Sequence, residues 1–192
     1  MIFSVGKTRV RISFFFAAVI TLLCISRADY ALAMISAFLH ETGHLTAMLI
    51  AGEIPYEICL NAFGVRIVRR NIVKLSVRQE IIVAAAGPAM NILLCIAVLI
   101  KTGKTDFLFS VNAVLALFNM LPVEPLDGSR ILYNIICIFS APEAAESVSK
   151  KISAAALFPL AAAGFFLLIK SGYNFTLLAS CVYISFYLVT DR

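Results

Sequence analysis

Charged residues are scarce in this sequence. Only 14% of its 192 residues are Asp, Glu, Lys or Arg, whereas 61% are hydrophobic and the mean hydropathy is +0.97. A soluble domain of average composition carries about 25% charged residues. The scarcity of charge therefore excludes an ordinary soluble protein and favours an integral membrane protein.

The patterns of cysteine and of basic residues exclude further classes. The five cysteines contain no C-x-x-C pair, and their number is odd. This excludes a disulfide framework, a zinc ribbon and a C-x-x-C redox centre, so we interpret the cysteines as small core residues. The net charge is +5, but the basic residues are dispersed over several loops and form no patch interleaved with aromatic residues. No nucleic-acid partner is therefore expected.

Long apolar runs divide the chain into six predicted membrane spans. A helix needs about 20 mostly apolar residues to cross a bilayer. The first run is not followed by an A-x-A cleavage site, so we interpret it as a retained helix and not as a signal peptide. The sequence thus predicts an all-α polytopic membrane protein, a six-helix bundle in a single domain over residues 1–192, with a core over 12–140 and C-terminal helices within 152–190. The six runs lie near residues 12–26, 30–51, 80–100, 107–121, 152–169 and 173–190.

The basic residues also predict the orientation of the chain. Lys and Arg concentrate in the short cytoplasmic loops of membrane proteins. If the N-terminus is cytoplasmic, all basic residues fall on that side except Arg27, Lys101, Lys104 and Lys170. We therefore expect a multi-pass protein of the cell membrane with both termini in the cytoplasm.

Only two histidines are present, and both belong to the pentapeptide His40-Glu41-Thr42-Gly43-His44 within the second apolar run. Residues four apart lie on one face of a helix, so both imidazoles can approach one metal ion. The pattern H-E-x-x-H is typical of zinc peptidases, in which the glutamate is the general base. Two histidines that face a polar cavity are the alternative. We favour a metal site, because ionisable residues inside a membrane span are costly and usually functional.

A third metal ligand has to come from another part of the chain. Catalytic zinc has three protein ligands and an open fourth position, and no third histidine exists. The third ligand is therefore a carboxylate or a thiolate. Most carboxylates lie at span ends or near loops, where solvation explains them. Asp127 differs, because it follows an apolar run in a segment broken by two prolines and a glycine, and such backbone at membrane depth usually borders a cavity. Nearby Glu124 is a reserve candidate.

Three segments in this order resemble the site-2 protease family, the intramembrane zinc metalloproteases of peptidase family M50. The resemblance covers roughly residues 12–140, and it is greatest to the short sporulation factor IVFB type. We expect this chain to have no PDZ or CBS domain. The last two predicted spans match no motif. The matching segments are the H-E-x-x-H pentapeptide, Gly87-Pro88-x-x-Asn91, and Asn119-x-x-Pro122-x-x-x-Leu126-Asp127-Gly128.

The resemblance implies roles for individual residues. His40, His44 and Asp127 would bind one Zn²⁺ per chain, and Glu41 would be the general base. Asn119 would help to hold the substrate carbonyl or its oxyanion, a role that suits a side-chain amide. Asn91 would pack or hydrogen-bond across helices. For both asparagines, a purely structural hydrogen bond between helices is the alternative.

The longest loop, residues 53–79, differs in composition from the apolar runs on either side of it. Residues 54–60 and 65–68 are rich in β-branched residues and flank a turn at 61–64, which predicts a β-hairpin or small sheet between the second and third spans. Family members carry a small membrane-associated sheet here, and an exposed strand edge can hold an unwound substrate as an added strand. The alternative is a basic cap that binds anionic lipid at the cytoplasmic face, and both can hold. The basic residues that would bind the lipid are Arg66, Arg69, Arg70 and Lys74.

Together these features predict a zinc metalloendopeptidase that hydrolyses a peptide bond in or near a transmembrane segment of a membrane protein or membrane-associated precursor. The resemblance implies regulated intramembrane proteolysis, in which a sigma-factor precursor or an anti-sigma factor is the candidate substrate. It also suggests a link to sporulation and a regulatory membrane partner. One alternative is a catalytically idle scaffold or chaperone that retains the protease fold. Another is a peptidase whose active domain lies outside the bilayer, which the position of H-E-x-x-H in an apolar run argues against.

Overall fold

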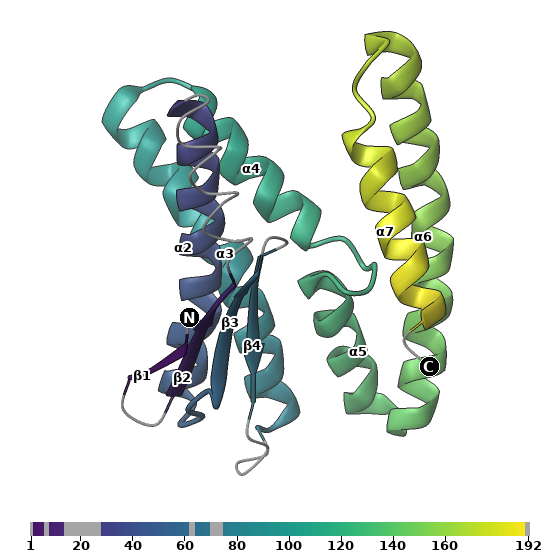
Figure 1. Cartoon of the computed structure of the whole chain (residues 1–192). Coiled ribbons are helices and arrows are strands. Elements are labelled where there is room, and N and C mark those ends of the chain that lie inside the picture. Colours follow the sequence, from purple (N-terminus) through teal and green to yellow (C-terminus); the bar gives the residue numbers. More distant parts are fainter. Residues whose placement is uncertain (1, 6–7, 14–27, 62–63, 70–74, 191–192) are drawn as a thin grey trace. The chain divides into compact units, whose positions relative to one another are not determined.

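The structure, a computed structural model, describes residues 2–5, 8–13, 28–61, 64–69 and 75–190 (Figure 1). The chain divides into two compact units, Met1–Leu117 and Phe118–Arg192, which we describe separately. Most of the first predicted span, residues 12–26, lies outside the described residues. The single domain expected from the sequence stays a prediction.

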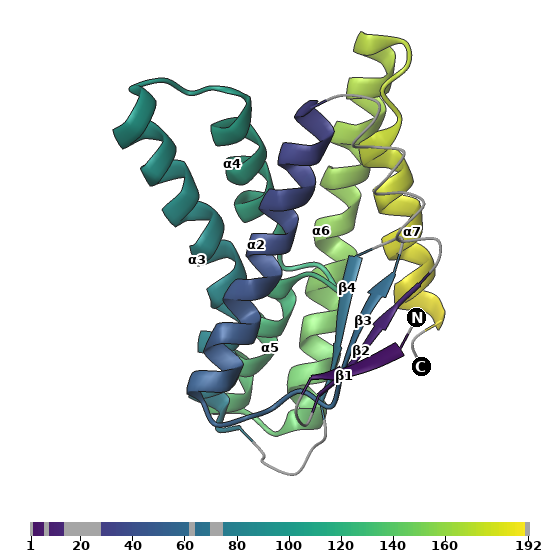
Figure 2. The same ribbon diagram turned by 60° about the vertical axis from the view of Figure 1, so that its left-hand side comes forward.

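The described helices of the first unit are α2 (Ala28–Ile50), α3 (Val77–Thr102) and α4 (Phe107–Asn119), of which α4 ends in the second unit. Helix α2 packs along α3, as Figure 2 shows. The two helices lie close together at Gly43, where a Cβ atom would lie only 2.6 Å from the carbonyl oxygen of Ala86. Small residues allow such close packing of membrane helices.

Helix α3 has well-defined ends. It begins with a capping box, in which the side chain of Ser76 accepts from the backbone of Gln79 and the side chain of Gln79 accepts from the backbone of Ser76. It ends at Gly103, whose positive φ of 65° suits a residue without a Cβ atom. These caps define both ends of α3.

A four-stranded sheet completes the first unit. Its strands lie in the order β1 (Ile2–Val5), β2 (Thr8–Ile12), β3 (Glu57–Asn61) and β4 (Gly64–Val68). The β3–β4 pair is antiparallel, which confirms the predicted hairpin. The antiparallel β1–β2 pair and its parallel junction with β3 were not predicted.

The missed strand β2 has a simple sequence pattern. Its sequence, TRVRI, alternates between more exposed and less exposed residues, which is the period of a strand. Its two arginines, Arg9 and Arg11, were expected among the cytoplasmic basic residues that precede the first predicted span. The five-residue alternation is too short to identify a strand unless its partner β3 is known.

The second unit contains α5 (Asp127–Phe139), α6 (Pro142–Ser171) and α7 (Thr176–Thr190). Helix α6 contacts both α5 and α7. Helix α5 was not predicted as an element, because 13 residues of mixed polarity are too few to span a bilayer.

Membrane insertion is supported by the length and composition of the helices. Among the described residues, α3 and α6 are long and apolar enough to cross a bilayer, whereas α4 and α7 are apolar but shorter. Large apolar side chains on α6 and α7 are exposed, as suits a lipid environment better than water. Five of the described helices coincide with predicted spans or extend them. The total of six membrane crossings stays a prediction. Examples of the exposed side chains are Phe158, Phe165, Phe166, Ile169 and Phe186.

Candidate metal centre

The two histidines of H-E-x-x-H lie together on α2. The Nε2 atoms of His40 and His44 are 3.1 Å apart, and the side chains are only 5% and 6% exposed. Two nitrogen ligands of one tetrahedral zinc ion, each about 2.0–2.1 Å from it, are separated by about 3.3 Å. The observed distance therefore fits two ligands of a single ion, and it confirms that the spacing places both rings on one face.

The ring of His44 is oriented by α3. Its Nδ1 atom lies 2.7 Å from the backbone carbonyl oxygen of Val83. A carbonyl oxygen only accepts, so Nδ1 carries a hydrogen, and in the neutral ring Nε2 then presents a lone pair. Hydrogen bonds of this kind commonly fix the tautomer and the direction of a metal-binding histidine.

Gly87 on α3 leaves space beside the two Nε2 atoms. A Cβ atom at this position would lie 2.3 Å from Nε2 of His44 and 2.6 Å from Nε2 of His40. Any side chain would thus collide with the imidazoles or fill the space next to them. The glycine of the Gly87-Pro88-x-x-Asn91 segment therefore has a direct physical link to H-E-x-x-H.

Glu41 follows His40 on α2 and is partly buried. Its position next to the first histidine agrees with the H-E-x-x-H pattern. Its role as general base stays a prediction.

Buried polar side chains lie one helical turn from His40 on α2 and from Gly87 on α3. The Nδ2 atom of Asn112 on α4 donates to Oγ of Ser36 on α2 (3.1 Å), and Ser36 is one helical turn before His40. Asn91 lies one turn after Gly87 on α3 and is 0% exposed. Within the described part of the chain, neither amide atom of Asn91 has a hydrogen-bond partner. Asn112, which belongs to none of the three motifs, thus makes a hydrogen bond between helices, and the packing or hydrogen-bonding role of Asn91 stays a prediction.

Asp127 belongs to the second unit, where it begins α5 and is 8% exposed. The segment before it is a series of turns, in which Val123 donates to the carbonyl oxygen of Leu121 (2.8 Å) and Leu126 to that of Val123 (2.8 Å). This confirms the predicted break in the helix.

Gly128 allows the segment to lie against α5. A Cβ atom here would lie 2.2 Å from the carbonyl oxygen of Met120 and 2.4 Å from that of Leu121. The backbone leading to Asp127 therefore passes too close to α5 for any larger residue. This explains the glycine of the L-D-G sequence.

Ser153 on α6 is bonded to the same segment. Its hydroxyl donates to the carbonyl oxygen of Pro122 (3.2 Å) and accepts from the backbone N–H of Glu124 (3.2 Å). Sequence reasoning missed this residue, because the only signal is a small polar residue within an apolar helix.

Asn119 and Glu124 also belong to the second unit. Asn119 is the last residue of α4 and is partly buried, and Glu124 is partly buried in the segment between α4 and α5. Neither the substrate-binding role of Asn119 nor the reserve role of Glu124 is tested by these positions. The structure thus joins His40 and His44 within the first unit, whereas their grouping with Asp127 stays a prediction.

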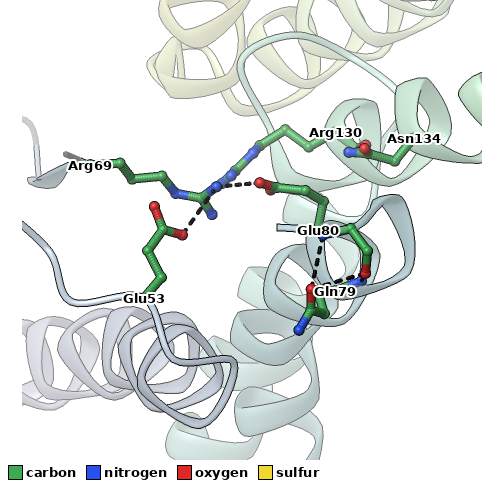
Figure 3. A network of polar contacts seen from close by, with 7 residues as sticks. Glu53, Arg69, Gln79, Glu80, Arg130 and Asn134 are labelled. Atoms are coloured by element: carbon green, nitrogen blue, oxygen red, sulfur yellow. Dashed lines mark hydrogen bonds and ion pairs between the residues drawn. The ribbon is translucent and has the colours of Figure 1, made fainter. Parts of the chain in front are cut away.

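An ion-pair network fastens the sheet to two helices of the first unit. Nη1 of Arg69, which follows β4, lies 2.5 Å from Oε1 of Glu80 in the first turn of α3 and 3.6 Å from Oε2 of Glu53 beyond α2 (Figure 3). Glu53 is only 5% exposed. Solvation alone, which was expected to explain the carboxylates near loops, therefore does not account for Glu53, which is nearly buried and faces Arg69.

Comparison with known proteins supports the reading of the motifs. Residues 102–160 match the family model described as peptidase family M50. The structure is similar to the site-2 protease from Methanocaldococcus jannaschii, with a TM-score of 0.66 and 20% sequence identity over 98% of this chain and 93% of that chain. No curated protein matches the sequence. The two matches confirm the resemblance to site-2 proteases that the three motifs indicated.

Proposed function

Starting from the relationship to the site-2 proteases of family M50, we propose that this chain is an intramembrane zinc metalloendopeptidase. It would hydrolyse a peptide bond in or next to a membrane-spanning segment of another protein. The observation that carries the proposal is the buried pair of His40 and His44, whose Nε2 atoms are 3.1 Å apart beside the space left by Gly87.

Three side chains would hold one zinc ion: His40, His44 and Asp127. Two imidazole nitrogens and a carboxylate are a ligand set that catalytic zinc uses, and three protein ligands leave one position open. All three side chains are buried, so an ion held by them would be shielded from bulk water. Zinc bound in this way polarises a carbonyl oxygen and lowers the pKa of a water molecule to about 7.

The other residues would move the proton and hold the substrate. Glu41, directly after a metal ligand, would accept the proton of the attacking water and return it to the leaving amine. The side-chain amide of Asn119 would donate a hydrogen bond to the substrate carbonyl as negative charge develops on its oxygen. The Val83 carbonyl would keep His44 in the tautomer that presents Nε2.

The substrate class follows from the membrane location and the sheet. We propose a six-span protein with both termini in the cytoplasm and its site near that face. Strands β1 and β4 are the two edges of the sheet, so each has backbone groups that an extended substrate can pair with. Basic residues of the cytoplasmic loops would bind anionic lipid. A membrane-tethered transcription regulator, as in the sporulation-type relatives suggested by the sequence, fits this class.

A Glu41→Gln variant tests the proposal. The variant and the wild-type chain are purified for zinc analysis and are co-expressed with candidate membrane substrates, with exposed Glu143 changed to Gln as the control. We expect Glu41→Gln to retain zinc and to lose cleavage, while Glu143→Gln keeps both. Wild-type protein that binds no zinc would instead favour an inactive scaffold, and unchanged cleavage by Glu41→Gln would exclude the proposed base.

A further inference from the structure

Ser153 is a buried polar residue in a helix that matches none of the three motifs. It lies on α6, and its side chain is 0% exposed. Its hydroxyl bonds to the backbone on both sides of one residue, donating to the carbonyl oxygen of Pro122 and accepting from the N–H of Glu124, each at 3.2 Å. Both bonded residues belong to the segment that ends at Asp127.

This segment needs partners for its backbone. Backbone N–H and C=O groups at membrane depth are costly unless they are hydrogen-bonded. Val123 and Leu126 donate to carbonyl oxygens within the segment. Pro125 has no N–H to donate. The hydroxyl of Ser153 therefore supplies bonds at the position where the segment turns toward Asp127.

We propose that Ser153 is a positioning residue, which fixes the segment from Pro122 to Glu124 and so directs the Asp127 carboxylate toward the metal. The inference rests on the proposed function. Glu124 is only three residues before Asp127, and Gly128 immediately after it is pressed against the carbonyl oxygens of Met120 and Leu121. The backbone on either side of Asp127 is thus held in place, by the bonds of Ser153 before it and by the close packing of Gly128 after it.

Ser149 provides a matched comparison on the same helix. It lies one turn before Ser153 and is also 0% exposed. In the part of the chain that the structure describes, its hydroxyl has no hydrogen-bond partner. Changing either serine to alanine removes one buried oxygen atom from α6, but only the change at Ser153 removes bonds to the Asp127 segment.

The test measures metal affinity directly. The full-length wild-type chain, Ser153→Ala, Ser149→Ala and Asp127→Ala are purified in detergent, and the Kd for Zn²⁺ is determined by competition with a chromogenic chelator. We expect Ser153→Ala to weaken zinc binding about tenfold, as is common for residues that orient a metal ligand, and Ser149→Ala to change it less than about twofold. The visible absorption spectrum of the Co²⁺-loaded protein should move toward that of Asp127→Ala only in Ser153→Ala.

A merely structural role would give a different result. Thermal unfolding of the metal-free proteins reports the stability that Ser153 contributes without the ion. Reduced stability of Ser153→Ala with unchanged zinc affinity and an unchanged Co²⁺ spectrum would overturn the inference and leave the proposed function intact. A wild-type chain whose zinc affinity does not depend on Asp127 would overturn both. Should Ser153→Ala not fold, the nearly isosteric Ser153→Cys, a weaker hydrogen-bonding group, carries the same test with a smaller expected loss.

Discussion

The Nδ1 atom of His44 lies 2.7 Å from the carbonyl oxygen of Val83, so a candidate metal ligand on α2 is oriented by the backbone of α3. A backbone carbonyl cannot be removed by changing the Val83 side chain. The orientation of His44 instead depends on how closely α2 and α3 pack. Changes at the contact between these helices should therefore affect metal binding even where they remove no ligand.

Gly87→Ala should greatly weaken metal binding while α3 still forms. Its Cβ atom would lie 2.3 Å from Nε2 of His44, so the imidazoles must move apart. We expect zinc affinity to fall by about a hundredfold or more, measured by chelator competition. Gly164→Ala, a helix glycine at the α6–α7 contact, is the control and should lower the unfolding temperature without changing zinc affinity. Normal zinc binding by Gly87→Ala would show that the histidine pair is not the metal site.

Gly43→Ala should separate α2 from α3. The added Cβ atom would lie 2.6 Å from the carbonyl oxygen of Ala86, which is backbone and cannot rotate away. Overpacking of this kind costs about 1–3 kcal/mol, so the unfolding temperature should drop, and zinc affinity should drop with it. The neighbouring change Thr42→Ala removes only a bond to the carbonyl oxygen of Leu39 on the same helix and should have little effect. Equal thermal stability of the two variants would contradict the close contact.

Arg69→Met should loosen the sheet from the helices. The change leaves Glu53, which is only 5% exposed, without the cation that faces it. We expect a loss of about 1–2 kcal/mol and faster proteolysis between β4 and α3. Lys150→Met breaks the exposed pair with Glu146 within α6 and should cost no more than about 0.5 kcal/mol. Similar proteolysis of both variants would show that the network does not hold the sheet.

The two buried asparagines of the first unit should respond in opposite directions. Asn112→Leu removes the bond to Ser36 and leaves that hydroxyl with one partner fewer, so it should destabilise the protein by about 1 kcal/mol. Asn91→Leu replaces an amide that has no hydrogen-bond partner among the described residues by an apolar group of the same branched shape, and it should be neutral or stabilising. Thermal unfolding of the metal-free proteins measures both. Destabilisation by Asn91→Leu would reveal a polar partner for the amide.

The sequence predicted those structural features that depend on residues only a few positions apart. The spacing of His40 and His44 predicted their common face, two prolines and a glycine predicted the break before Asp127, and the β-branched residues predicted the β3–β4 hairpin. Each of these inferences needs only the geometry of one helix, turn or hairpin.

The sequence did not predict the contacts between segments that are distant along the chain. The pairing of β2 with β3, the ion pairs of Arg69 and the bonds of Ser153 join residues that no fixed spacing connects. Their residue types are also ordinary, since arginines and serines occur in many roles. Such contacts depend on how the chain packs, which composition and motif spacing do not determine.

On successive turns of one face, helix α3 contacts Arg69 after strand β4 and the two histidines of α2. Glu80 pairs with Arg69, the Val83 carbonyl accepts from His44, and Gly87 leaves space for both imidazoles. Sliding α3 by a single residue along its axis, about 1.5 Å, would disrupt all of these contacts together. Only one axial position of α3 satisfies all three contacts. The ion pair that anchors the sheet and the geometry of the histidine pair are therefore gained or lost together.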